Sequence, residues 1–214
     1  MKRVAVYLSL LLLAGMLAGL VAGQAPAAPM ELVAPALFDV GFHTTAGDFV
    51  IEVQRDWAPH AADRFYTLVR SGYYNGNAFY RVVDRFVAQW GLNPDPSVTA
   101  LWVHRTLPDD PVVLSNMAGT VSFAALGRNT RTTQVFINLG NNQRLDKMGF
   151  AAFGRVVSGM NVALHLASDY GDGPPQGSGP DQARIVAQGA AYLTQNFPRL
   201  DVIYTAALVR PRGR

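Results

Sequence analysis

Apolar and polar residues alternate along two neighbouring segments, 37–43 and 47–54, early in the chain. Alternation with a period of two is typical of half-buried β-strands, and the short turn of small and polar residues between the segments predicts a hairpin. From 58 to 71 the apolar residues recur instead at helical spacing, with Pro59 in the first turn. The start of the chain therefore predicts two paired strands followed by one helix.

Short apolar runs separated by Gly and Asn turns fill most of the remaining chain. They predict further strands, whereas 159–167 has the pattern of a second helix and 201–209 that of a closing strand. This order of elements favours a mainly β fold, a closed β-barrel with helices outside it. The 214 residues suffice for one domain with a substantial core.

The segment 170–198 departs from this plan and is interpreted as an insertion. Its first part, 171–180, is rich in Gly and Pro and holds one carboxylate, so we expect a solvated connection rather than a phosphate or metal site. Its second part, 181–197, predicts an extra helix that Asp181 can cap. The apolar stripe that should pack on the barrel consists of Ile185, Val186, Leu193 and Phe197.

The first 27 residues have the form of a signal peptide. Lys2 and Arg3 precede an apolar run over 4–22, and small residues follow it. We expect cleavage and a periplasmic or secreted protein, with 28–36 as a linker, 37–209 as the folded domain and 210–214 as a tail. Because the run is nearly long enough to span a bilayer, a membrane protein anchored by an uncleaved leader is the alternative.

Charge and composition exclude several functions. Of 18 basic residues, removal of Lys2 and Arg3 leaves 16 against 15 acidic ones, and the arginines are scattered, so no nucleic acid partner is expected. The chain has no cysteine, which excludes disulfides and a thiol nucleophile. Its four histidines lack metal-ligand spacing, so no metal site is expected.

Two apolar stretches, 78–91 and 119–138, carry polar side chains that could act together. Arg81 supplies a fixed fork of charged donors, and the amide of Gln134 can both donate and accept hydrogen bonds. Phe86 and Phe136 add flat apolar surfaces. Each aromatic residue taken alone fits the core of a strand, but the combination suits an extended peptide.

These stretches resemble the cyclophilin-type peptidyl-prolyl isomerases, and with the leader they resemble an exported bacterial type. Residues 79–91 follow the motif F-[HY]-R-[VI]-[VI]-x-x-F-x-x-Q-x-G, and 122–137 follow the second motif of that family. The resemblance implies a closed eight-stranded barrel capped by two α-helices, here with the extra helix before the last strand. It also implies acceleration of X-Pro bond rotation, without a cofactor, on proline-containing polypeptides; we expect a monomer.

The resemblance also implies site residues. Arg81 would be the catalytic donor to the twisted X-Pro bond, and Gln89 would orient it. Arg144 stands where relatives often have a rim Trp, Ala125 where many have Asn, and Tyr80 where many have His. The residues expected to bind substrate are Phe86, Val87, Ala124, Ala125, Gln134, Phe136, Leu145 and Phe150. A proline-peptide-binding chaperone or scaffold with little turnover is the alternative function.

Overall fold

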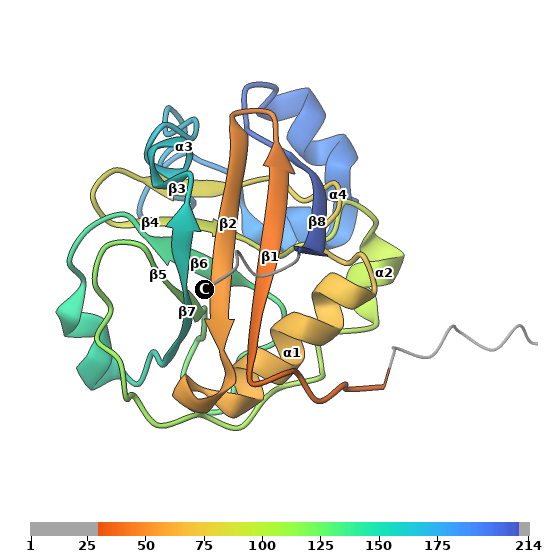
Figure 1. Ribbon diagram of the computed structural model, residues 1–214. Coiled ribbons are helices and arrows are strands. Elements are labelled where there is room, and N and C mark those ends of the chain that lie inside the picture. The colour runs from red at the N-terminus through yellow and green to blue at the C-terminus, as the bar shows by residue number, and fades with distance from the viewer. Residues whose placement is uncertain (1–29, 210–214) are drawn as a thin grey trace, which may run out of the picture.

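Eight strands form a single antiparallel sheet in the computed structural model, which describes residues 30–209 (Figure 1). The order across the sheet is β3-β4-β6-β5-β7-β2-β1-β8. The strands are β1 Leu37–Thr44, β2 Gly47–Gln54, β3 Arg81–Val83, β4 Val87–Trp90, β5 Thr120–Phe123, β6 Val135–Asn138, β7 Ala152–Ser158 and β8 Ile203–Val209. The predicted leader and tail lie outside the described residues, so the structure says nothing of either.

The sheet curls but is open, so the prediction of a closed barrel is not confirmed. Within residues 30–209, its edge strands β3 and β8 share no ladder, although an isolated bridge between Ala78 and Val202 joins the residues that precede them. Beside it, the Phe79 amide donates to the Asp201 carbonyl at 2.9 Å. Closure stops there because the next side chain, Tyr80, packs against the extra helix instead of continuing a ladder to β8.

Four α-helices and two short 3₁₀ helices lie around the sheet. The predicted first helix is confirmed as α1, and the second, α3, is shorter than expected; α2 was not predicted because its five residues are too few to show a period. The bounds are η1 Arg55–Trp57, α1 Pro59–Arg70, α2 Pro96–Ala100, η2 Gln143–Met148, α3 Met160–Leu164 and α4 Gln182–Asn196. None of the helices within 30–209 has the length and apolar character needed to cross a membrane.

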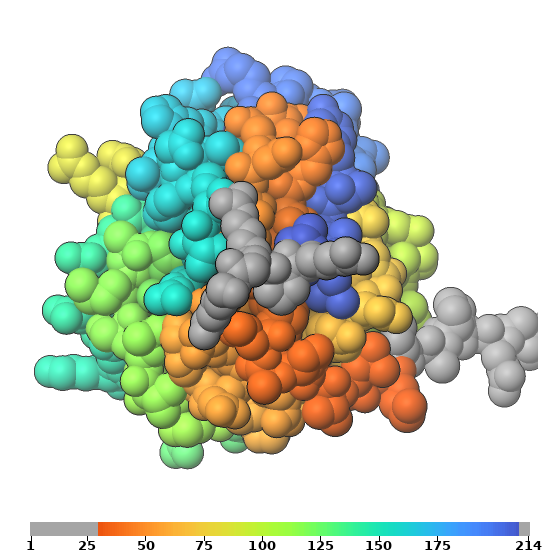
Figure 2. Space-filling view, in the orientation of Figure 1, coloured from red at the N-terminus to blue at the C-terminus, as the bar shows by residue number. Residues whose placement is uncertain are grey.

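The main core lies between the sheet and α1, which runs beside β1 and β2 in Figure 1. The first hairpin alternates apolar and polar residues, and its apolar side chains point into this core. The rings of Phe42 and Phe49 are stacked with their centroids 4.7 Å apart and are almost fully buried. Phe65 and Leu68 of α1 are fully buried as well. Removing this apolar surface from water drives the hairpin and the helix together. The opposite side of the sheet forms a continuous outer surface in Figure 2, where β7, β2, β1 and β8 lie side by side.

The insertion contains the predicted extra helix. The Asp181 carboxylate accepts the backbone N–H of Ala183 at 2.8 Å, as expected for an N-cap. Ile185 and Leu193 of α4 are buried in a second apolar cluster with Tyr80 and other residues near β3. Helix α4 thereby packs against Ala78 and Tyr80, which immediately precede β3 and Arg81.

Candidate active site

The β3–β4 hairpin places the two predicted catalytic side chains opposite each other. Arg81 pairs with Gln89 in the antiparallel register, and the Arg81 Nη1 group donates to the Gln89 Oε1 atom at 3.0 Å. The Gln89 amide in turn donates to the Gln134 Oε1 atom at 3.0 Å. Arg81 and Gln89 of the first motif and Gln134 of the second are therefore joined by hydrogen bonds.

Six apolar residues beside these hydrogen-bonded side chains form a small cluster separate from the main core. Phe136 and Leu145 are buried, and Phe136 meets Phe150 edge to face at 5.8 Å between ring centroids. Phe86, Val87 and Phe150 complete the cluster together with Ala124. An apolar floor of this kind is suited to a flat, aliphatic ring such as that of proline.

A cavity of about 380 Å³ lies over this floor, and all ten residues of the predicted site line it. They are Arg81, Phe86, Val87, Gln89, Ala124, Ala125, Gln134, Phe136, Leu145 and Phe150. The motifs gave no sign of the remaining wall, which consists of Leu92, Val103, Leu126, Thr130, Thr132, Thr133, Gln182 and Val186. Gln182 and Val186 belong to α4, so the insertion contributes to the cavity.

Tyr80 is a site residue that was noted in the motif but given no role. Its hydroxyl donates to the Gln134 Oε1 atom and accepts from the Gln89 Nε2 atom at 2.9 Å. Burial of the ring raises the pKa of Tyr80 far above its ordinary value, because a buried phenolate would lose its hydration. Tyr80 therefore stays a neutral donor that orients both glutamines.

The expectation of a plain solvated connection at 171–180 is wrong for one residue. The Asp172 carboxylate accepts from Arg81 at both oxygens, at 2.8 Å from Nε and 2.9 Å from Nη2. These hydrogen bonds lower the pKa of Asp172, so the carboxylate is charged at neutral pH. Sequence reasoning could not find the pair, because 91 positions separate its members.

The rim of the cavity carries a second arginine. The Arg144 guanidinium lies 4.8 Å from the centroid of the Phe86 ring, and that of Arg81 lies 5.4 Å from the same centroid. Cations at these distances are attracted to the ring face. Arg144 therefore lies beside Phe86, a residue that lines the cavity, and its role at the rim stays a prediction.

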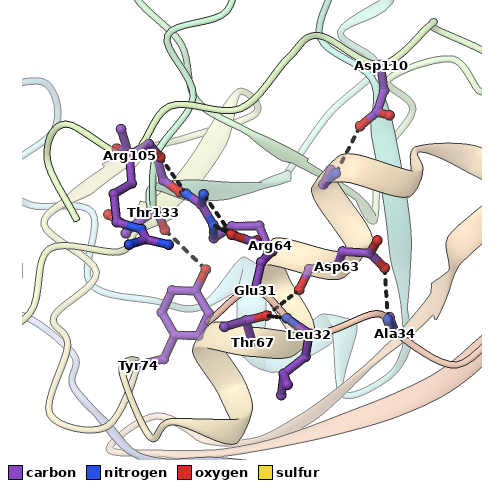
Figure 3. Close-up of polar contacts among 12 residues, drawn as sticks. Glu31, Leu32, Ala34, Asp63, Arg64, Thr67, Tyr74, Arg105, Asp110 and Thr133 are labelled. Atoms are coloured by element: carbon purple, nitrogen blue, oxygen red, sulfur yellow. Dashed lines mark hydrogen bonds and ion pairs between the residues drawn. The ribbon is translucent and has the colours of Figure 1, made fainter. Parts of the chain in front are cut away.

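Behind the cavity, a buried arginine fixes part of the wall (Figure 3). The Arg64 Nη1 group donates to the carbonyls of Thr132 at 2.8 Å and Arg105 at 2.7 Å. Its Nε group donates to the Glu31 carboxylate at 2.8 Å, which offsets the buried charge. The hydroxyl of Tyr74 donates to the Thr133 carbonyl at 3.1 Å. Arg64 of α1 and Tyr74 thereby hold the segment 130–133, which precedes β6 and carries the threonines of the cavity.

Among residues 30–209, no three His, Asp or Glu side chains gather in a way that could hold a metal ion. The polar groups at the cavity are instead the guanidinium, amides and hydroxyls described above. Such a set can bind a peptide backbone and donate hydrogen bonds to it.

The chain matches the family model described as cyclophilin type peptidyl-prolyl cis-trans isomerase/CLD over residues 39–187. It is 36% identical over 145 residues to the peptidyl-prolyl cis-trans isomerase ppi1 of Schizosaccharomyces pombe, covering 64% of this chain and 91% of the relative. It is 35% identical over 133 residues to the peptidyl-prolyl cis-trans isomerase-like 3 of Mus musculus, covering 59% of this chain and 80% of that protein.

Solved structures show the same fold. A cyclophilin type peptidyl-prolyl cis-trans isomerase of Cryptosporidium parvum aligns with a TM-score of 0.59 and 20% identity, over 82% of this chain and 99% of that one. A second structure of that protein was determined in the presence of the dipeptide Ala-Pro and aligns with a TM-score of 0.59 and 22% identity, over 81% of this chain and 99% of that one.

Proposed function

We propose, from the premise that this chain belongs to the cyclophilin type peptidyl-prolyl cis-trans isomerase family and is an enzyme of that class, that its cavity binds X-Pro segments and that Arg81 is the catalytic residue. The observation that carries the proposal is the convergence on one cavity of all ten residues that the family resemblance implied. Proline-containing polypeptides are the proposed substrates.

The chemistry required is rotation about a single peptide bond. Resonance holds that bond planar with a barrier of about 18–20 kcal/mol, and X-Pro bonds isomerise over tens of seconds without help. As the bond twists, the proline nitrogen loses conjugation and its lone pair becomes a hydrogen-bond acceptor. A donor aimed at that nitrogen binds the twisted form better than the planar one, which lowers the barrier.

Arg81 is the proposed donor because its guanidinium lines the cavity and is held there by hydrogen bonds. Gln89 and Asp172 fix its guanidinium, so little reorganisation is needed when the bond twists. The apolar floor around Phe136 would grip the prolyl ring. Gln134, oriented by Tyr80 and Gln89, would hold the flanking backbone.

The test is exchange NMR between the cis and trans forms of an X-Pro peptide. Arg81→Ala should lower the exchange rate at saturating enzyme by about a hundred- to a thousandfold, the scale for loss of a preorganised donor. Arg128→Ala is the matched control, since Arg128 is exposed on the loop beside the cavity. Unchanged exchange in Arg81→Ala would refute the role of Arg81. Peptide binding without any acceleration by the unmodified protein would favour the alternative, a binding module.

We further propose that the enzyme is an exported protein of bacterial type, released by cleavage of its leader. The basic start, apolar run and small residues of 1–27 support this location. Mass spectrometry of the protein from its native source should find an N-terminus between 23 and 30. Intact Met1 in a membrane fraction would favour the anchored form instead.

A further inference from the structure

The ion pair between Arg81 and Asp172 joins the motif to the insertion. Of the five N–H groups of the Arg81 side chain, Asp172 takes two and Gln89 takes one. Two N–H groups remain, one on each terminal nitrogen, for a substrate. The carboxylate therefore occupies the side of the guanidinium that includes Nε and leaves both terminal nitrogens partly available.

The backbone of the insertion holds Asp172 in place. The Gly179 amide donates to the Asp172 carbonyl at 2.8 Å. A Cβ atom at Gly177 would lie 2.3 Å from that carbonyl oxygen, so the loop folds back on itself more closely than any other residue permits. On one side of the loop, Tyr170 meets Phe197 at the end of α4, with ring centroids 5.0 Å apart. The carboxylate thus stands on a compact loop tied to a helix.

We infer that Asp172 is a positioning residue for the isomerase reaction, which holds the Arg81 guanidinium so that its two remaining N–H groups face the bound X-Pro segment. A bidentate carboxylate fixes both the plane and the rotation of a guanidinium, whereas the single hydrogen bond that Arg81 donates to Gln89 does not. The Phe86 ring, 5.4 Å from the same guanidinium, limits its remaining freedom.

A purely structural role does not account for this pair. The two side chains are 22% and 28% exposed, and ion pairs that water reaches contribute little to stability. Orientation of a donor at the reacting bond, by contrast, changes the rate strongly, since small displacements from the productive geometry are costly. The inference rests on the proposed role of Arg81.

Replacement of the Asp172 carboxylate tests this positioning role. Asp172→Ala should lower kcat for an X-Pro peptide by about ten- to a hundredfold with KM changed less than about threefold, because binding is retained while the donor is loosely held. Asp172→Asn, whose single carbonyl oxygen can keep one of the two bonds, should fall between. Asp172→Glu should restore part of kcat. The matched control is Asp169→Asn, because Asp169 forms an exposed pair with Arg199 near the same loop.

A spectroscopic measurement separates positioning from loss of structure. In the unmodified protein the Arg81 Nε–H should give a discrete NMR signal protected from solvent exchange, and Asp172→Ala should abolish that protection while other amide signals stay in place. Unchanged kcat, or an increased kcat, in Asp172→Ala would overturn the inference; an increase would show that the carboxylate restrains the donor from reaching the substrate.

The double variant distinguishes this failure from failure of the proposed function. If Arg81 is the donor and Asp172 acts through it, Asp172→Ala should have no further effect on kcat in an Arg81→Ala background. If Arg81→Ala alone leaves kcat unchanged, the proposed mechanism fails. If Arg81→Ala is slow but Asp172→Ala is not, only the positioning role fails.

Discussion

Removal of the buried Arg64 side chain should destabilise the protein far more than neutralisation of its carboxylate partner. Arg64→Ala leaves the carbonyls of Arg105 and Thr132 without their donor and removes a contact with the Trp102 ring, 5.1 Å away. The Arg64 side chain is 3% exposed, so these groups have little access to water. Each buried carbonyl left without a donor costs about 1–3 kcal/mol, so the two carbonyls and the lost ring contact together cost about 3–5 kcal/mol of unfolding free energy.

Glu31→Gln should cost only about 1 kcal/mol, because the Gln amide oxygen can still accept a hydrogen bond from Arg64 and both carbonyls keep their donor. For a domain of this size, the two costs correspond to falls in Tm of about 6–20 °C and about 2–4 °C. Urea unfolding followed by circular dichroism measures both, with Arg70→Ala at the end of α1 as control. Equal losses from the two substitutions would refute the reasoning, since they would show that the pair alone, rather than the two carbonyls, makes Arg64 important.

Three other measurements probe the floor of the cavity, its rim and the stability of the fold at low pH. Phe136→Ala should weaken peptide binding by about ten- to a hundredfold, the scale for one lost aromatic contact. It should reduce the unfolding free energy less than Phe153→Ala, which alters the main core. A larger loss of unfolding free energy for Phe136→Ala than for Phe153→Ala would make Phe136 a core residue. Arg144→Trp should tighten binding of a cyclosporin-type apolar cyclic peptide in a fluorescence titration, because an indole is cheaper to desolvate than a guanidinium, and unchanged affinity would place the rim elsewhere. Burial raises the pKa of Asp63, but the hydrogen bonds that its carboxylate accepts outweigh burial and lower this pKa below the ordinary 3.8. Hydrogen bonds from the Arg81 guanidinium likewise lower the pKa of Asp172. Their stabilisation is therefore complete above about pH 5 and lost as the pH falls through the folded-state values, and an acid titration of Asp63→Asn should show a shallower loss.

The sequence predicted local elements well where one face of an element is uniformly buried. Phe42 and Phe49 alternate with polar neighbours, and the apolar residues of α1 recur every third or fourth position, so each pattern indicated its element. Arg64 shows the limit of such reasoning, since it lies on the buried side of α1 and its partners are distant carbonyls.

The candidate site could be predicted because eight of its ten predicted residues stand at fixed spacing in two motifs. Asp172 could not, because the contact depends on how the insertion folds back over β3, and neither a period nor a motif encodes that path. The closed barrel was expected for a related reason. Strand patterns indicate how many strands form, but the open edge depends on α4, whose side chains occupy the place beside Tyr80.

The pairing of β1 with β8 has a consequence for how the protein is made. These strands come from opposite ends of the described chain, yet they exchange hydrogen bonds over most of their length. A growing chain therefore presents β1 with an unpaired edge until its last strand is available, and such an edge is a template for pairing with other chains. Synthesis halted after α4 would leave every residue of the cavity present and the sheet still one strand short.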